Sequence, residues 1–312
     1  MSYDAIRKYG IAIILILLII IFAISSPVFF TIENLFNVLR QISMLGISAV
    51  GMIFVILTGG IDLSVGSLMS LANVICAKLM VESGLPPLLA ISITLLISCI
   101  VGIVNAFFIN EMDIPPLITT LGTMTIIRGL SYVLSGGKHI WGFPEEFKLL
   151  GQGHVGIIPI PVIIMFLIFI VGWIILYKTT YGRRIYGIGG NEEATRLSGI
   201  NIKKIKYLVY MSCSLLTGLA GIIMLSRLNT GQPKIGGGYE LEVVTAVVLG
   251  GVSIFGGVGK LSGVLFGVLI IGILSNGMIL LNIMDYYQQI ILGLVLLAAV
   301  GFDNKISKRD ID

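Results

Sequence analysis

Charge is what this chain lacks most. Of its 312 residues, 12% are charged and 56% are hydrophobic, and the mean hydropathy is +1.05. A soluble domain carries about 25% charged residues, so a soluble fold could not bury so much apolar surface. Several apolar stretches approach the roughly 20 residues that cross a bilayer. The composition therefore predicts an all-α integral membrane protein, with a single membrane domain over residues 1–312.

Cysteine and histidine are also scarce. Cys76, Cys99 and Cys213 all lie inside apolar stretches, which predicts a packing role rather than a disulfide framework. His139 and His154 have no cysteine near them in the sequence, so a metal site is not expected. The modest net charge of +4 does not favour nucleic acid as a partner.

Sequence motifs for nucleotide binding and catalysis are absent too. The segment GGVGK at 256–260 is similar to a phosphate loop, but Ile254 stands where the first glycine is required and Leu261 replaces the serine or threonine. A dinucleotide pattern beginning at Gly187 fails because Glu192 occupies its last glycine position. No nucleophile elbow or HExxH motif is found. We therefore expect no ATP hydrolysis by this chain and do not favour a membrane-embedded enzyme.

What the chain does contain is a series of apolar stretches separated by glycines and prolines, such as Gly59-Gly60, Pro86-Pro87 and Pro115-Pro116. We interpret these stretches as about ten transmembrane helices. Their approximate ranges are 10–26, 43–58, 64–82, 88–110, 116–135, 159–178, 207–228, 243–255, 261–281 and 287–303.

The positive charges predict the orientation, because cytoplasmic loops carry an excess of lysine and arginine. With both termini in the cytoplasm, thirteen positive charges lie inside and five outside. The loop 179–206 is then cytoplasmic and the loop 136–158 is external. The first stretch could alternatively be a cleaved signal peptide, since Arg7-Lys8 precede a short apolar run and Ala23-Ile24-Ser25 is similar to a cleavage site. The inside charges are Arg7, Lys8, Lys178, Arg183, Arg184, Arg196, Lys203, Lys204, Lys206, Lys260, Lys305, Lys308 and Arg309, and the outside charges are Arg40, Lys138, Lys148, Arg227 and Lys234.

One polar, basic and glycine-rich stretch stands out, YGRRIYGIGGNEEATRLSG at 181–199. Asn191 is a good helix N-cap, followed by two glutamates in the first turn, where backbone N–H groups favour negative charge. Glu192 and Arg196 are four residues apart and could form an ion pair. Gly199 suits the left-handed residue that ends a helix. The pattern predicts a capped helix over 192–198.

A helix of two turns is marginal in water by itself. Ala194 and Leu197 would share one apolar face of this helix. We therefore expect the helix over 192–198 to dock into a partner.

Ionisable side chains inside the membrane are rare and functional in ion-driven carriers. Here the acidic residues fall near the ends of the predicted spans, and only Lys78 and Arg128 lie within them. Lys78 is close enough to the outer surface to extend its amine there. Arg128 belongs either to a polar pathway or to a contact between helices.

Amides and hydroxyls within the spans suit an uncharged cargo rich in hydroxyl groups, although each alone also suits a hydrogen bond between helices. The candidates for a pathway or gate are Asp62, Asn73, Asn105, Thr123, Arg128, Asn276 and Gln288.

Four stretches resemble one family closely, and they extend over almost the whole chain. The chain looks like the membrane permease of a bacterial ABC importer for monosaccharides. The matching stretches are FFTIENLFNVLRQIS (29–43), LTGGIDLSVGSL (57–68), YGRRIYGIGGNEEATRLSGINIKKIKYLVY (181–210) and GYELEVVTAVVLGGVSIFGGVGKLSGVLFG (238–267), with YYQ at 286–288 and DNK at 303–305.

This resemblance implies the fold of the vitamin B12-type importer permeases, a type II importer fold. It implies a permease homodimer in the inner membrane with lipid around it, a cytoplasmic ABC ATPase that binds ATP and magnesium, and an extracytoplasmic sugar-binding protein. The cargo it implies is ribose or a similar monosaccharide, while xylose, galactose and autoinducer-2 stay open. It implies a role in coupling to the ATPase for Gly189, Asn191, Glu192, Glu193, Ala194, Arg196 and Gly199. An ion-coupled sugar carrier is the main alternative, and the resemblance disfavours an ABC exporter.

Overall fold

The computed structural model describes residues 3–309, with side chains described for residues 12–301. Helices form almost all of the described chain, and one short antiparallel hairpin pairs His154 with Pro159. In order, the elements are α1 (Tyr3–Ser25), α2 (Ile32–Leu57), α3 (Val65–Val81), α4 (Pro87–Glu111), α5 (Pro116–Ser135), α6 (Glu145–Gln152), β1 (His154–Val155), β2 (Ile158–Pro159), α7 (Ile160–Lys178), α8 (Thr180–Gly190), α9 (Glu192–Leu197), α10 (Ile202–Leu228), α11 (Tyr239–Leu249), α12 (Leu261–Leu280) and α13 (Asp285–Arg309).

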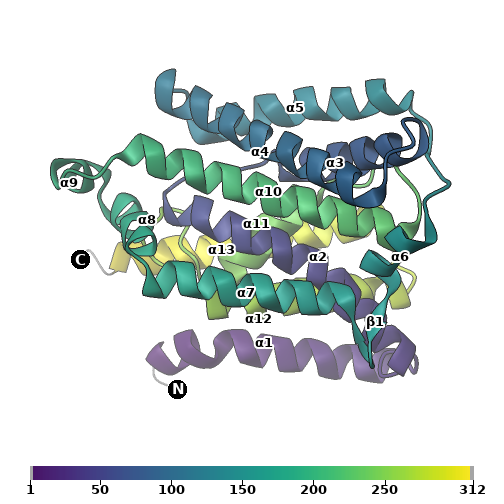
Figure 1. Cartoon of the computed structure of the whole chain (residues 1–312). Coiled ribbons are helices and arrows are strands. Elements are labelled where there is room, and N and C mark those ends of the chain that lie inside the picture. The colour runs from purple at the N-terminus through teal and green to yellow at the C-terminus, as the bar shows by residue number, and fades with distance from the viewer. Residues whose placement is uncertain (1–2, 310–312) are drawn as a thin grey trace.

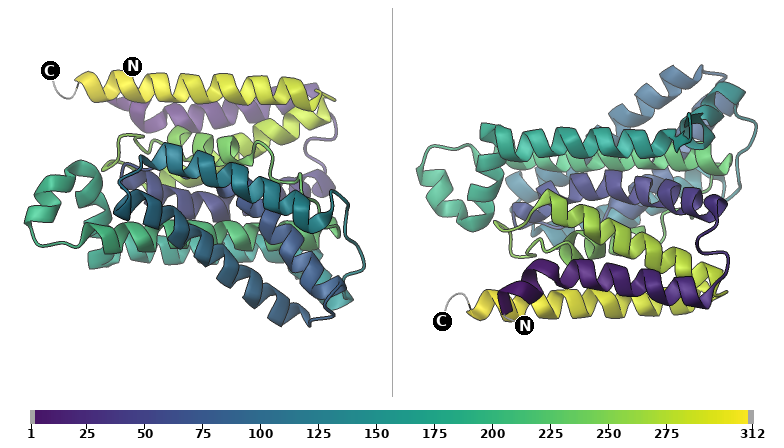
Figure 2. Two further views of the ribbon diagram at one scale, coloured as in Figure 1. Left: turned by 90° about the horizontal axis from the view of Figure 1, so that it is seen from above. Right: turned by 90° about the horizontal axis from the view of Figure 1, so that it is seen from below.

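The long helices form a bundle with two distinct ends (Figure 1). α6 and the β1–β2 hairpin lie at one end, while α8 and α9 project from the other, as the two views of Figure 2 also show. α1 begins and α13 ends at the α8–α9 end. This arrangement agrees with the predicted placement of 136–158 and 179–206 on opposite sides. Several inside charges, Arg7, Lys8, Lys305, Lys308 and Arg309, have side chains outside the described residues.

Six of the described helices are long and apolar enough to cross a membrane: α2, α4, α5, α7, α10 and α12. Apolar parts of α1, α3 and α13 are shorter. Several helices extend beyond their predicted ranges, and α11 ends before the end of its own. α2 begins eleven residues before the predicted 43, at Ile32, because the Thr31 side chain accepts a hydrogen bond from the backbone of Asn34. α11 ends at Leu249 rather than 255, since Gly251 adopts a positive φ of 82°.

α2 is the centre of the bundle. In its most apolar stretch, 83% of the residues are buried, compared with 22% in α4 and 33% in α7. α2 packs against α7, α10, α11 and α12. On α7, large side chains such as Phe166, Ile170 and Ile174 are exposed. An apolar side chain exposed on a membrane helix suits contact with lipid, so the bundle is apolar both at its centre and on much of its surface.

Glycines allow helix backbones to approach closely, as small residues do in membrane proteins generally. A Cβ atom on Gly267 would lie 1.9 Å from the carbonyl oxygen of Ala246, and one on Gly221 would lie 2.6 Å from that of Met69. These glycines therefore allow α12 to pack closely against α11, and α10 against α3. Gly221 of α10 and Gly267 of α12 are thus used for packing within the chain.

We predict that Gly267→Ala destabilises the bundle by about 1–3 kcal/mol, the usual cost of overpacking. Gly293→Ala on α13 is the matched control, because a Cβ there meets nothing within 4 Å. The measurement is the Tm of each purified variant in detergent. Equal melting of the two variants would contradict the packing role of Gly267.

Candidate functional site

The segment α8–α9 extends beyond the end of the bundle (Figure 1). Asn191 caps α9 as predicted, because its side chain accepts a hydrogen bond from the backbone of Ala194 at 2.8 Å. Gly199 has a φ of +79° at the end of the segment, also as predicted. α9 is thus a short helix that is stabilised at both of its ends.

The charges on α9 pair differently from the prediction. Arg196 contacts Glu193 at 2.7 Å, three residues away, rather than Glu192. Glu192 instead contacts Lys206 of α10 at 2.9 Å, and this contact ties α9 back to the bundle. The hydrogen bond to Glu193 raises the pKa of Arg196 above its usual range, so Arg196 remains a cation at every physiological pH.

One face of α9 is attached to the bundle and the other is open. The Thr195 side chain is 8% exposed, and a Cβ on Gly187 would lie 3.2 Å from its hydroxyl. Leu197 is 79% exposed at the tip of the molecule, and Ala194 is exposed as well. The open face of α9 therefore carries Ala194 and Leu197, while Thr195 faces α8.

α8 was not predicted, because its glycines are poor helix formers. Thr179 caps it by accepting from the backbone of Gly182 at 3.2 Å. Its last turn lies against two loops of the bundle, where a Cβ on Gly189 would be 1.9 Å from the carbonyl oxygen of Leu57 and 2.3 Å from the backbone nitrogen of Gly257. Only glycine permits this approach.

We call this meeting point the glycine joint; it comprises Gly59, Gly189, Gly256 and Gly257. The Gly257 N–H donates to the Leu57 carbonyl at 3.0 Å, which links the loop after α11 to the end of α2. Gly59, Gly256 and Gly257 have φ values of +78°, +89° and +71°, a region that disfavours other residues.

Tyr186 of α8 makes a further link to the loop before α12, because its hydroxyl donates to the carbonyl of Gly259 at 2.9 Å. Burial raises the pKa of Tyr186, so the hydroxyl keeps its proton. The joint and this bond together connect α8 to loops in both halves of the chain.

The candidate pathway residues do not converge on one site. Asp62 and Asn105 are the pair that the structure brings together: Asn105 donates to the hydroxyl of Ser64 at 3.0 Å, and that hydroxyl donates to Asp62 at 2.5 Å. Asp62 was expected near a water-facing end of a span, but it is 0% exposed. Its second carboxylate oxygen has no hydrogen-bond partner among the described residues.

Four other candidates form hydrogen bonds within one helix or between segments of the chain. Asn73 accepts from the backbone of Gln232 at 2.7 Å, and Asn276 exchanges hydrogen bonds with Asn34. Thr123 bonds to Thr120 of its own helix, and Gln288 donates to the carbonyl of Ile283. Each of these contacts holds elements of the fold in place.

Arg128 faces outward from α5, with 46% of its side chain exposed, and lies 3.8 Å from the carboxylate of Glu240. Glu240 lies in the first turn of α11 and is 8% exposed. Sequence reasoning placed Glu240 at the outer end of a span and so missed it. The signal was available in the glycines at 236–238, which interrupt the apolar sequence and let α11 begin inside the bundle.

The described residues contain no group of three or more side chains arranged to hold a metal ion. Cys76, Cys99 and Cys213 are free thiols. The side chain of His154 contacts Arg40 at 2.6 Å, which joins the β1–β2 hairpin to α2.

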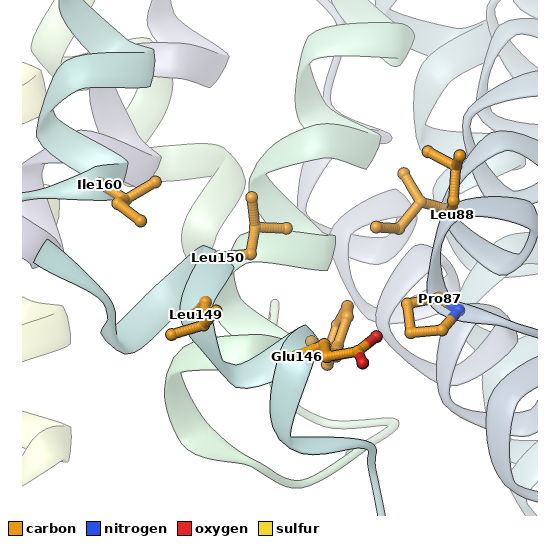
Figure 3. Close-up of a pocket in the computed structure, with 8 residues that line it drawn as sticks. Pro87, Leu88, Glu146, Leu149, Leu150 and Ile160 are labelled. Atoms are coloured by element: carbon orange, nitrogen blue, oxygen red, sulfur yellow. The ribbon is translucent and has the colours of Figure 1, made fainter. Parts of the chain in front are cut away.

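An apolar groove lies near the α6 end of the bundle (Figure 3). Pro87 and Leu88 at the start of α4 face Leu149 and Leu150 of α6 across it. Its wall is aliphatic apart from Glu146 and Phe147. Such a surface suits a lipid chain rather than a polar solute, so we do not place the solute site there.

Comparisons with known proteins identify one family model and several relatives that match this chain. The family described as "Branched-chain amino acid transport system / permease component" matches residues 34–300. The ribose import permease protein RbsC of Bacillus subtilis is 44% identical over 303 residues, covering 96% of this chain and 94% of that protein. RbsC of Escherichia coli K12 is 46% identical over 297 residues, covering 94% and 92%.

The L-arabinose transport system permease protein AraH of Escherichia coli K12 is 41% identical over 308 residues, covering 95% of this chain and 90% of that protein. No solved structure matches the chain. The extent of these matches decides membership: this chain belongs to the permease family of branched-chain amino acid and related transport systems.

Proposed function

We propose that this chain is the permease subunit of an ATP-driven importer that moves ribose or a similar monosaccharide inward. The observation that carries the proposal is the similarity to ribose import permeases, at 44–46% identity along more than nine-tenths of both chains. Relatives named for L-arabinose and D-allose are less similar, at 41% and 36% identity. Ribose is therefore the favoured cargo.

The proposed architecture is a single domain over 1–312 with ten membrane spans, α1–α5, α7 and α10–α13, in the vitamin B12-importer fold. Two copies would form the pathway between them. The outward face of α5 supports this arrangement, because Arg128 is half exposed in a membrane span and an arginine is costly against lipid. Gly122 and Gly129 lie open on the same helix, and small residues favour close helix contacts in membranes.

The proposed orientation places α8, α9 and both termini in the cytoplasm of a cell with this chain in its inner membrane. There α9 would dock the ATPase subunit, which binds ATP and magnesium, while a sugar-binding protein docks at the α6 end. The chain itself then needs no cofactor and catalyses no reaction. The exposed Leu197 and the charges of Glu193 and Arg196 support α9 as the docking surface.

The proposed mechanism is alternating access, in which each ligand favours one conformation of the bundle. Closure of the ATPase displaces α9 and, through it, α8. The glycine joint carries that displacement to the end of α2 and to the loop after α11, because Gly257 is hydrogen-bonded to Leu57. Both halves of the chain would then move together.

An ion-coupled carrier remains the alternative, favoured by one observation: Asp62 is a fully buried carboxylate with a free oxygen, and buried carboxylates mark ion pathways in such carriers. Sugar uptake by reconstituted vesicles distinguishes the ATP-driven importer from the ion-coupled carrier. We expect sugar uptake with the ATPase, ATP and binding protein in the absence of any ion gradient. Uptake that follows a sodium or proton gradient without ATP would overturn the importer.

The docking surface is tested by reversing the charge pair of α9. Glu193→Lys with Arg196→Glu keeps an ion pair three residues apart, so α9 stays folded, but reverses the charges that a partner meets. We expect the amount of co-purified ATPase to fall at least about tenfold, equivalent to about 1.4 kcal/mol. The matched control is Glu145→Lys with Lys148→Glu on α6, which reverses a similar pair at the opposite end. Equal co-purification of ATPase by both double variants would exclude α9.

The glycine joint is tested by a pair of adjacent substitutions. Gly189→Ala places a methyl group against Leu57 and Gly257 and forces the two loops apart, whereas a Cβ on Gly190 meets nothing within 4 Å. We expect Gly189→Ala to retain ATPase binding but to lower ATP-driven uptake at least about tenfold, about 1.4 kcal/mol in the coupled step. Gly190→Ala should transport normally. If both variants show the same ATP-driven uptake, the glycine joint does not transmit the movement.

A further inference from the structure

The start of α10, which lies beside α9 (Figure 1), is held by ion pairs to two other helices. Lys206 of α10 contacts Glu192 of α9 at 2.9 Å. Lys203, one turn earlier on α10, contacts Glu111 at the end of α4 at 2.6 Å. Side chains three residues apart are neighbours on a helix surface, so the start of α10 joins α9 to α4. We call these four residues, Glu111, Glu192, Lys203 and Lys206, the charge bridge.

A second contact reinforces the pair of Lys203 and Glu111. The side-chain amide of Asn110, also at the end of α4, donates to the backbone carbonyl of Lys203 at 3.2 Å. Asn110 is only 7% exposed, whereas the Lys203 and Glu111 side chains are 58% and 38% exposed. Exposed ion pairs contribute little to stability by themselves. The bond from Asn110 to the backbone therefore fixes the two helix ends together, and the ion pair adds to a contact that already exists.

α4 and α10 also approach closely at two further levels. A Cβ atom on Gly102 of α4 would lie 2.5 Å from the carbonyl oxygen of Tyr210, and one on Gly218 of α10 would lie 2.2 Å from the hydroxyl oxygen of Ser98. The two helices are therefore antiparallel and packed together along much of their length. Closely packed interiors transmit a displacement rather than absorb it. A movement at the start of α10 is thus expected to move α4 as well.

The connection from α4 to α5 is short and constrained. Only residues 112–115 separate the two helices. The Ile114 N–H donates to the carbonyl of Phe108 at 3.2 Å, and Asp113 has a φ of +53°, so the turn folds back onto the end of α4. A turn of this length leaves little slack between the helices. A displacement of the end of α4 therefore reaches the start of α5, the helix that carries Arg128.

We propose that Lys203 and Glu111 are positioning residues for transport, which carry the displacement of α9 through α10 to α4 and α5. The α8–α9 segment then has two separate connections to the bundle. The glycine joint leads from α8 to the end of α2 and the loop after α11, whereas the charge bridge leads from α9 to α4. The two connections share no residue. This inference rests on the proposed function, because it assumes that the ATPase moves α9.

The experiment uses the complete importer, with permease, ATPase and binding protein reconstituted in vesicles and D-ribose as the probe. Ribose uptake and ATP hydrolysis are measured in the same vesicles, and the readout is the ratio of ribose moved to ATP hydrolysed. A contact that serves the fold alone would not change this ratio in a folded variant.

Lys203→Glu places a second negative charge against Glu111 and should lower the ratio at least about fivefold, a typical effect for a residue that couples two distant sites. Glu111→Lys places two positive charges together and should act alike. Combining Lys203→Glu with Glu111→Lys restores an ion pair between the same positions. The double variant should recover a ratio within about twofold of the unmodified chain, since contacting residues are not additive.

The matched control is Lys204→Glu, the same change at the next residue. The Lys204 side chain is exposed and makes no hydrogen bond or ion pair within the described part of the chain, so this variant should keep the unmodified ratio. Co-purification shows whether each variant still binds the ATPase, and its Tm in detergent shows whether it is folded. If Lys203→Glu melts early, Lys203→Gln removes the pair without repulsion and should lower the ratio at least about twofold.

The proposal is overturned if folded Lys203→Glu keeps the unmodified ratio, if the double variant does not recover it, or if Lys204→Glu lowers it equally. It is also overturned if the single variants lose the ATPase, because Lys203 and Glu111 would then be docking residues. Failure here is distinct from failure of the proposed function. A normal ratio in Lys203→Glu leaves the importer standing, whereas the absence of ATP-driven uptake by the unmodified complex would remove the importer itself.

Discussion

Within a membrane, every backbone N–H and carbonyl needs a partner from the protein itself, and this requirement controls where the chain can depart from a helix. The chain departs from it at 58–64, 229–238 and 250–260. Side chains of α3 satisfy the second loop: Asn73 accepts from Gln232 at 2.7 Å and Ser70 accepts from Gly236 at 2.9 Å. The polar residues of the spans are therefore needed first for the fold, and only the unpaired ones are left for a solute.

The same requirement explains the glycine joint. The end of α2, the loop after α11 and the end of α8 can approach one another this closely only if no side chain separates them. The contacts at Gly189 and Gly257 meet that condition. A surface helix docked by a partner would ordinarily move independently of the bundle, but backbone contact leaves no flexible side chain between them. In the proposed importer, this contact makes a displacement of α9 a displacement of α2.

The sequence predicted what depends on composition and local spacing. The caps of α9 at Asn191 and Gly199 follow from residue type alone, and the membrane character follows from hydropathy. It did not predict the Glu193–Arg196 pair or the partner of Glu192, because those depend on where α10 places Lys206. For Asn73 and Asn276 the sequence indicated a hydrogen bond between helices but not its partner, since each partner lies more than a hundred residues away in the chain.

α11 joins these features into one arrangement. It has 11 residues and is therefore about 16 Å long, so α11 fills only about half of its membrane span and the loops on either side complete that span. Its first turn carries two glutamates that face different sides: Glu240 lies beside Arg128 of α5, and Glu242 lines a small cavity together with Ser275 of α12. Its last turn leads within eight residues to Gly257 and the glycine joint. Because a short helix moves as a rigid body, a shift at the joint changes the surroundings of both glutamates together, one beside Arg128 of α5 and the other beside Ser275 of α12.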